Sequence, residues 1–200
     1  LLSGMGELHL EILVDRLLRE FKVAANVGKP MVAYRETLTE QVKASANYER
    51  EVAGKKHFAH VDIKLSPLNR SEGYQFACNI EAEGLTEELK RAIRDGAKDA
   101  TEVGPLLGYA MVDLKAEVTG VQVRPDEASV MAFRVAAGNA LREAMRSAKC
   151  QLLEPMFKVE ILVPEEFMGN VIGDLNSRRG KVNNMEPKGH VQIVNAEMPL

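Results

Sequence analysis

The segment of residues 164–180 limits the fold more than any other part of the chain, because it marks both ends of one short helix. Pro164 and the two glutamates after it suit the positive N-terminal end of a helix. Arg178 and Arg179 suit the negative C-terminal end, and Gly180 is expected to take the left-handed conformation that ends the helix. Apolar residues recur between these ends at helical spacing, namely Met168, Val171, Ile172 and Leu175. The segment predicts a helix with one apolar face that another element must cover.

Hydrophobic periodicity predicts a mixture of helices and strands in the rest of the chain. The predicted helices cover residues 6–21, 84–103 and 126–148, and the predicted strands cover 22–27, 32–52, 56–65, 74–82, 111–123, 152–163, 180–186 and 190–198. A stripe of small residues within 89–100 would let the second helix lie close against a sheet, and Asp126 is expected to cap the third. Phe58 is expected on the same side of its strand as Val61, with a slip in the alternation between them. This order of elements predicts an α+β chain built from modules.

The charge balance excludes a polycation. The 26 basic and 29 acidic residues give a net charge of −3, so any contact with nucleic acid must come from local patches. No apolar run approaches the roughly 20 residues that span a bilayer, and no secretion signal opens the sequence. Cys78 and Cys150 lack any partner spacing and are interpreted as two reduced thiols. We therefore expect a cytoplasmic protein that does not associate with membranes.

No motif indicates enzymatic chemistry. The Gly-x-x-x-x-Gly-Lys-Ser/Thr loop that cradles nucleotide phosphates does not occur in the sequence. His57 and His60 are three residues apart in a predicted strand and so face opposite sides, which does not suit a shared metal. The acidic pair Glu87 and Glu88 is better explained by a helix dipole than by acid–base catalysis. We expect no catalytic residue, no metal and no GTP hydrolysis in this chain. A metabolic α+β enzyme would need a polar pocket that the sequence does not display.

Two cationic segments are the candidate binding sites. The first is a predicted loop tip around Gly54, whose members are Arg50, Lys55, Lys56, His57, Phe58 and His60. Such a tip suits contact with phosphates and stacking of Phe58 on an exposed base, and a solvated hairpin end is the alternative interpretation. The second segment contains Arg178, Arg179 and Lys181, for which the alternative role is to complement the helix dipole.

Three blocks of sequence resemble elongation factor G, a family of translational GTPases. Residues 164–180 are similar to the opening of the last domain of that family. Residues 3–11 and 28–37 resemble its passage from the third domain into the fourth, and residues 153–160 resemble its passage from the fourth into the fifth. The three blocks occur in the order of the family and span nearly the whole chain.

The resemblance implies a domain organisation that periodicity cannot supply. It implies the end of domain III over residues 1–29, domain IV over 30–151 and the start of domain V over 152–200. Domain IV of the family is a sandwich like that of ribosomal protein S5, with a left-handed βαβ crossover, and its third and fifth domains are ferredoxin-like. The two end modules would then be partial, and we expect them to be mobile or to self-associate through uncovered apolar surface.

The resemblance also implies a function. Domain IV of the family enters the decoding region of the ribosome and promotes translocation of tRNA and mRNA, and domain V faces ribosomal RNA. GTP and Mg²⁺ would belong to domains of the intact protein that this chain lacks, and no cofactor is expected here. The implied partners are the ribosome, rRNA, tRNA and mRNA.

The two domain IV loops that would match those of the family, 53–60 and about 119–127, both depart from its usual pattern. The first has fewer glycines, and in the second Arg124 stands where a histidine is usual. Two alternatives therefore stay open. The chain is similar to a paralogue specialised for ribosome recycling, or it is a free-standing RNA-binding module.

Overall fold

The computed structural model of the protein describes residue 2 and residues 4–28, 33–52 and 54–199 of the 200-residue chain. The chain divides into two compact units, residues 1–32 and 33–200. Helices and strands are both present, in sheets of two, four and three strands, so the predicted α+β class is confirmed. No helix in the described ranges is long and apolar enough to cross a membrane.

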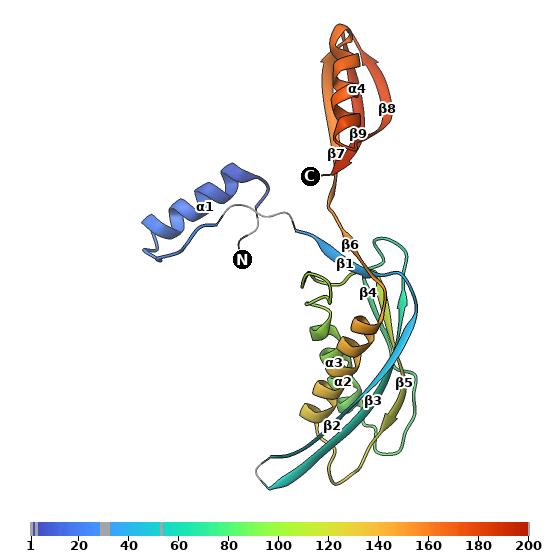
Figure 1. Ribbon diagram of the computed structural model, residues 1–200. Coiled ribbons are helices and arrows are strands. Elements are labelled where there is room, and N and C mark those ends of the chain that lie inside the picture. Colours follow the sequence, from blue (N-terminus) through green and yellow to red (C-terminus); the bar gives the residue numbers. More distant parts are fainter. Residues whose placement is uncertain (1, 3, 29–32, 53, 200) are drawn as a thin grey trace. The chain divides into compact units, whose positions relative to one another are not determined.

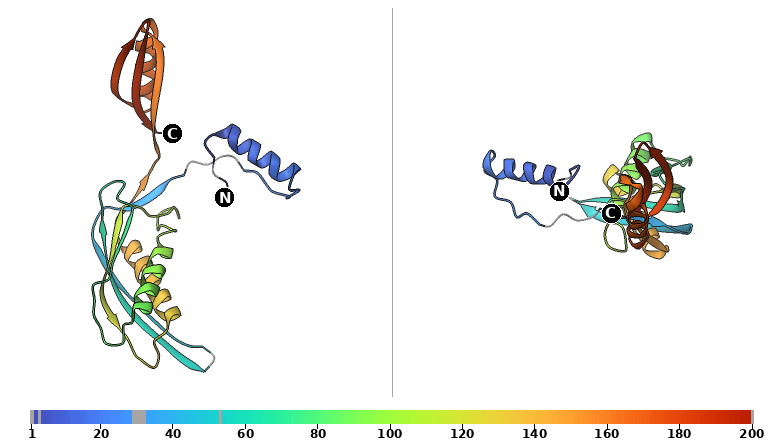
Figure 2. Two further views of the ribbon diagram at one scale, coloured as in Figure 1. Left: turned by 180° about the vertical axis from the view of Figure 1, so that it is seen from behind. Right: turned by 90° about the horizontal axis from the view of Figure 1, so that it is seen from above.

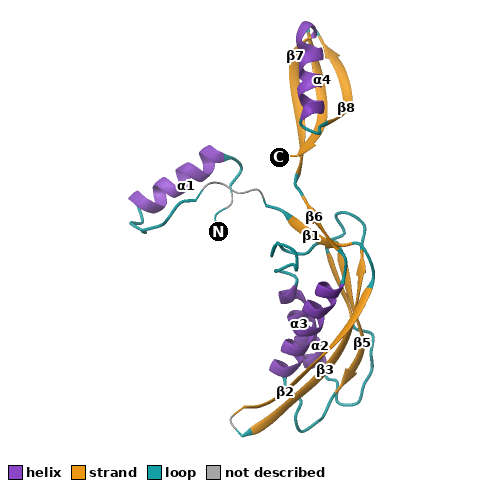
Figure 3. Cartoon of the chain, viewed as in Figure 1, coloured by secondary structure: helices purple, strands orange, loops and turns teal. Residues whose placement is uncertain are grey.

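The first unit contains helix α1, Glu7–Arg19. An ion pair one turn apart joins Arg19 Nε and Asp15 Oδ1 at 2.7 Å. The strand predicted over 22–27 is wrong, because these residues have no partner strand and are drawn as loop in Figure 3. A strand exists only where its backbone groups are paired, and apolar content alone does not supply that pairing.

The second unit begins with a large mixed sheet. Its strands are β2 (Val42–Val52), β3 (Lys55–Pro67), β4 (Tyr74–Ala77) and β5 (Leu114–Gln122), in the order β2-β3-β5-β4. β2 and β3 form one long antiparallel hairpin (Figure 1). β4 and β5 are parallel and are joined through a helix, which makes a βαβ unit.

Two helices cover one face of this sheet, as Figure 2 shows from behind. They are α2 (Glu87–Ala100) and α3 (Val130–Ser147). The small stripe of α2 brings this helix close to α3, and its buried residues share one core with the sheet. A Cβ atom on Gly96 would collide with the backbone oxygen of Arg134, so only glycine permits this close approach. The core contains Phe133, Ile63 and Leu141, each fully buried between the helices and the sheet.

The helix caps differ in part from those predicted. Thr86 accepts a hydrogen bond from the backbone N–H of Leu89 at the start of α2. At α3 the cap is Ser129, whose Oγ accepts from Ala132 N–H at 3.3 Å. The predicted cap Asp126 instead lies in the turn that precedes the helix. Both residue types accept such bonds well, so the sequence alone did not decide between them.

A two-stranded antiparallel ladder joins the segments by which the chain enters and leaves this domain. Strand β1 (Arg35–Leu38) pairs with β6 (Cys150–Leu153). Glu36 on β1 is fully buried, and its carboxylate accepts the backbone N–H groups of Leu106, Leu107 and Tyr109 at 2.9, 2.9 and 3.1 Å. This one side chain therefore fixes the loop between α2 and β5.

The C-terminal module is a three-stranded sheet with one helix on it. Its strands are β7 (Met156–Pro164), β8 (Lys181–Lys188) and β9 (Val191–Pro199), in the order β7-β9-β8. A 3-10 turn, η1 (Glu165–Phe167), leads into helix α4 (Met168–Ser177). Leu175 of α4 packs with Val163, Val194 and Ala196 in a small core.

The end of α4 corrects one prediction. The left-handed residue is Arg179, with φ of 61°, and not Gly180. Arg179 N–H donates to Asn176 O at 3.1 Å, and Gly180 N–H donates to Leu175 O at 2.7 Å. This pair of bonds is a Schellman motif with arginine in the usual place of glycine. Gly180 is needed for a different reason, because a Cβ there would lie 2.8 Å from Leu175 O.

Candidate nucleic-acid interface

The β2–β3 hairpin carries the first predicted site at its tip. The strands are in register up to the turn, with Arg50 opposite His57 and Val52 opposite Lys55. Gly54 turns the chain with φ of 76°, a conformation that favours glycine. Arg50, Lys55 and Lys56 are all exposed. No ion pair within the described ranges involves these three side chains. They present positive charge to solvent and could contact phosphates.

Phe58 does not serve as the exposed stacking surface that we predicted. Its side chain is only 4% exposed. The alternation along β3 has no slip at this point, so Phe58 lies on the sheet face opposite Ala59 and Val61. The guanidinium of Arg124 covers the ring, with Cζ 3.6 Å from the ring centroid. A base therefore cannot reach Phe58 while Arg124 holds this position.

Arg124 comes from the loop after β5 and is tied to the hairpin at several points. Its Nη1 lies 3.1 Å from Glu127 Oε2 and 3.6 Å from Glu49 Oε1 on β2. The backbone N–H of Phe58 donates to Glu127 O at 2.9 Å. The structure thus brings together the two loops that the sequence marks separately. Arginine stacks on aromatic rings more readily than lysine does, which explains the residue type.

The two histidines have structural partners. His57 Nδ1 lies 2.9 Å from Ser129 Oγ, the residue that caps α3. Because Ser129 Oγ accepts from Ala132 N–H, its own O–H is available to donate to His57. His60 Nε2 lies 3.1 Å from Asp62 Oδ1, and its other ring nitrogen contacts Asn47. These contacts join β3 to the start of α3 and to β2.

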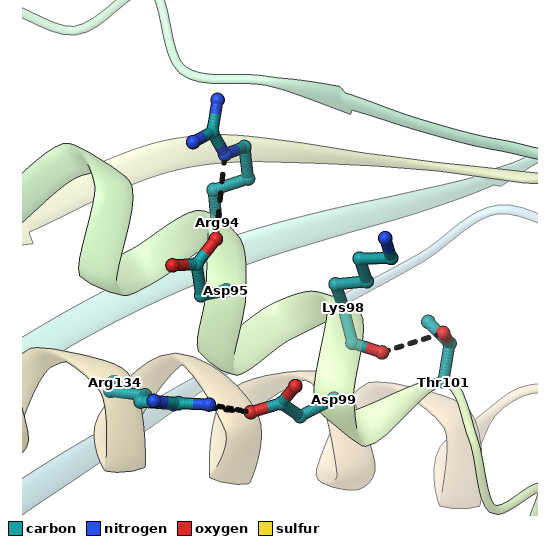
Figure 4. Close-up of polar contacts among 6 residues, drawn as sticks. All are labelled: Arg94, Asp95, Lys98, Asp99, Thr101 and Arg134. Atoms are coloured by element: carbon teal, nitrogen blue, oxygen red, sulfur yellow. Dashed lines mark hydrogen bonds and ion pairs between the residues drawn. The ribbon is translucent and has the colours of Figure 1, made fainter.

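Two ion pairs lie on the outer surface of the two helices, as Figure 4 shows. Arg134 Nη2 lies 2.5 Å from Asp99 Oδ2, which raises the pKa of the arginine by hydrogen bonding and charge. Arg94 Nε lies 3.6 Å from Asp95 Oδ1. Thr101 Oγ donates to the backbone oxygen of Lys98 at 2.7 Å and closes the end of α2. These two pairs neutralise part of the positive charge on this surface.

The second predicted site lies at the end of α4. Arg178 Nε pairs with Asp174 Oδ2 at 2.9 Å, one helical turn back. Arg179 makes a two-pronged contact with Glu154, with both N–O distances 2.8 Å. That contact raises the pKa of Arg179 through a hydrogen bond and charge. Lys181 is exposed at the start of β8. The predicted cluster is present, but two of its three cations are held by carboxylates on the surface.

Sequence reasoning missed the carboxylates that hold these arginines. Glu127 is three residues from Arg124, a spacing that the sequence could have indicated. Glu49 and Glu154 lie 75 and 25 residues from their partners, and no local signal could find them. Within the described ranges, no group of three or more His, Cys, Asp or Glu side chains could hold a metal ion.

Comparisons with known proteins agree along the whole chain. The family model described as "Elongation factor G, domain IV" matches residues 30–149. "Elongation Factor G, domain III" matches residues 1–29, and "Elongation factor G C-terminus" matches residues 151–200. "Elongation factor G 1" of Bdellovibrio bacteriovorus is 50% identical over 202 residues, which cover 100% of this chain and 29% of that protein.

A solved structure supports the same relationship. A crystal structure of a protein from Thermus thermophilus matches with a TM-score of 0.83 and 32% identity, over 98% of this chain and 29% of that one. The chain thus spans less than a third of the length of either relative. Because the domain IV model alone matches more than half of the sequence, the chain belongs to the elongation factor G family.

Proposed function

We propose that this chain is the ribosome-contacting part of a translation elongation factor. Its central domain enters the decoding region and promotes movement of tRNA and mRNA, driven by GTP hydrolysis in domains that precede it. GTP and Mg²⁺ bind in those domains, and the intact factor works in the cytoplasm. The observation that carries the proposal is the match of three elongation factor G domains, in order, over residues 1–200.

The geometry of the central domain suits such a role. The β2–β3 hairpin is long, and its two strands are paired from the base to the turn. Such a hairpin suits a stiff projection that reaches a binding site with its tip. Arg50, Lys55 and Lys56 at the tip supply charge for RNA phosphates. The proposed action is therefore one of shape and charge, with the chemistry performed elsewhere in the intact protein.

The C-terminal module would supply a second binding surface. Arg178, Arg179 and Lys181 lie exposed beside the end of α4, and Lys181 has no carboxylate partner among the described residues. We propose that it faces ribosomal RNA of the large subunit. A substitution that removes one phosphate interaction should reduce the slope of the salt dependence of binding by about one.

The test uses the full-length protein that carries this chain. Lys55→Glu with Lys56→Glu should weaken binding to ribosomes and slow translocation, with a flatter dependence of affinity on salt. Lys43→Glu with Lys98→Glu, two charge reversals at exposed residues away from the tip, is the matched control. If the tip variant binds and translocates like wild type while remaining folded, the hairpin tip is not the contact.

The position of Arg124 favours one alternative. An arginine stands in the loop where the family usually carries a histidine, and it is held by Glu49, Glu127 and Phe58. The alternative is a factor that separates ribosomal subunits after termination. Measuring translocation and subunit separation with the same preparation distinguishes the two, since activity in separation alone would replace the leading proposal.

A further inference from the structure

One flat face of the Arg124 guanidinium is left for a partner. One face of its guanidinium lies on the ring of Phe58, with Cζ 3.6 Å from the centroid. Its Nη1 end faces the carboxylates of Glu49 and Glu127, at 3.6 and 3.1 Å. The side chain is nevertheless 52% exposed. Both ion pairs use Nη1, so the second face of the planar group and its Nε–Nη2 edge have no partner among the described residues.

The surroundings of Arg124 disfavour a phosphate. Two carboxylates already neutralise the guanidinium, and they would repel a further anion brought to the same edge. A nucleobase carries no such charge, and its flat face matches the open face of the guanidinium. Stacking of RNA bases on arginine planes and on aromatic rings is a general mode of recognition.

The plane is also fixed in direction before any partner arrives. Glu127 is tied to β3, because its backbone oxygen accepts from Phe58 N–H at 2.9 Å. Ser129, two residues further on, contacts His57 at 2.9 Å. The loop is therefore fastened to β3 at Phe58 itself and at the residue before it. A side chain held in this way loses less conformational entropy on binding than a mobile one.

We propose that Arg124 is a stacking platform for an unpaired nucleobase and that Phe58 is the residue that positions it. This inference rests on the proposed contact between the hairpin tip and RNA. It assigns different tasks to the side chains at the tip. Lys55 and Lys56 contact phosphates, Arg124 contacts a base through its face, and buried Phe58 supports that face from below.

The test compares substitutions that separate charge from planarity, in the full-length protein. Arg124→Lys keeps the charge and loses the plane, and it should weaken ribosome binding about tenfold without changing the salt slope. Arg124→Trp, made with Glu49→Gln and Glu127→Gln so that no carboxylate is left uncompensated, keeps a plane and loses the charge, so it should retain most of the affinity. Arg146→Lys, at the exposed last turn of α3, is the matched control and should bind like wild type.

A second comparison isolates the positioning role. Phe58→Leu preserves apolar volume in the buried site but removes the aromatic face, so it should weaken binding in the same direction as Arg124→Lys. The variant with both substitutions should bind ribosomes only slightly more weakly than either single variant, because both changes remove the same contact. Melting temperature shows whether each variant is folded.

The outcomes separate this inference from the function on which it rests. Wild-type affinity in Arg124→Lys, or strong loss in Arg124→Trp, would mean that the charge matters and the plane does not, and the platform would be refuted. If the platform is refuted but Lys55→Glu with Lys56→Glu still weakens binding, the proposed contact between the hairpin tip and RNA remains supported. Additive effects of the Phe58 and Arg124 changes would remove the positioning role alone.

Discussion

Arg179 occupies a backbone conformation that glycine usually takes at the end of a helix. Its φ is 61°, while the glycine beside it has no such requirement. A left-handed conformation costs an L-residue roughly 1–2 kcal/mol, and strain of this kind is concentrated at functional sites. The arrangement is consistent with the proposed role of Arg179 in contacting RNA, because glycine would end the helix at lower cost.

The strain at Arg179 can be measured. Arg179→Gly, made in a Glu154→Gln background so that the ion pair is absent from the comparison, should raise the free energy of unfolding by about 0.5–1 kcal/mol. Urea denaturation of the two proteins gives the difference. The same substitution should weaken ribosome binding. A loss of stability would show that Arg179 stabilises the helix end through other contacts.

Gly96 gives a second prediction for a single residue. Gly96→Ala should lower the free energy of unfolding by about 1–3 kcal/mol, because the new methyl group would collide with the backbone of Arg134 and push α2 away from α3. The matched control is Gly169→Ala in α4, where a Cβ meets nothing within 4 Å. That change should leave stability equal or raised by up to about 1 kcal/mol. Equal effects of both changes would contradict the close packing of the two helices.

The sequence predicted which residues gather at the site better than it predicted their exposure. Arg50, Lys55 and Lys56 lie at the hairpin tip as expected. Phe58 was assigned to the wrong face because it is a buried apolar residue on the outer face of a regular strand, and the side chain that covers it comes from 66 residues away in the sequence. The alternation of residues within one strand cannot show that a side chain from a distant loop lies over one of them.

At the scale of elements, buried carboxylates fix the connections between helices and strands. Glu36 accepts three backbone N–H groups and has no exposed surface. Asp113 accepts those of Ser71 and Gly73 at 3.1 and 2.8 Å and so holds the turn between β3 and β4. Neither carboxylate could be recognised in the sequence, because their partners are backbone groups 40 or more residues away.

Replacing the carboxylate of Glu36 should loosen the loop that it holds. Glu36→Gln sets an amide N–H against backbone N–H groups, and it should cost about 2–4 kcal/mol of stability. Amide exchange at Leu106, Leu107 and Tyr109 should accelerate first. Glu40→Gln, an exposed change nearby in sequence, should alter stability by less than about 0.5 kcal/mol. Unchanged exchange in the loop would exclude the anchoring role.

The ion pair between β3 and β5 gives a prediction about pH. Lys64 Nζ lies 2.8 Å from Glu117 Oε2, and its hydrogen bond and charge lower the pKa of Glu117. A lowered carboxylate pKa stabilises the fold above the ordinary carboxyl range, and the contribution disappears as the pH falls through the lowered value. Lys64→Met should therefore raise the pKa of Glu117 in an NMR titration. Lys43→Met, at the cross-strand neighbour of Lys64, should leave it unchanged.

Periodicity predicted an element correctly where the element's own residues determine its structure. It failed where the structure depends on pairing or packing with another segment. Helix α2 lies within its predicted range and carries its predicted buried stripe. The strand expected over 22–27 has no neighbouring strand in the first unit. The stripe of small residues was expected to allow a close approach to the sheet, but residue size does not show which backbone comes closest, and at Gly96 that backbone belongs to α3.

At the scale of the whole molecule, uncovered apolar surface predicts association. No residue of α1 is buried, and Leu8, Ile12 and Leu18 are 70%, 51% and 42% exposed. We expect the 200-residue chain to show a mass that rises with concentration in light scattering. Leu8→Glu with Ile12→Glu should suppress the rise, whereas Glu11→Gln on the same helix should not. A constant monomer mass over a wide concentration range would refute this expectation.

The β1–β6 ladder has a consequence for how such a protein can be altered. Arg35 stands opposite Leu153, so the incoming and outgoing chains of the central domain are immediate neighbours. Because both ends of the domain lie at one place, it can be exchanged between related proteins. Only the two chain junctions next to the β1–β6 ladder then have to match between donor and host. Grafting residues 35–153 into a related factor should therefore transfer the hairpin and its Arg124 loop intact, and evolution could vary this domain independently of the rest.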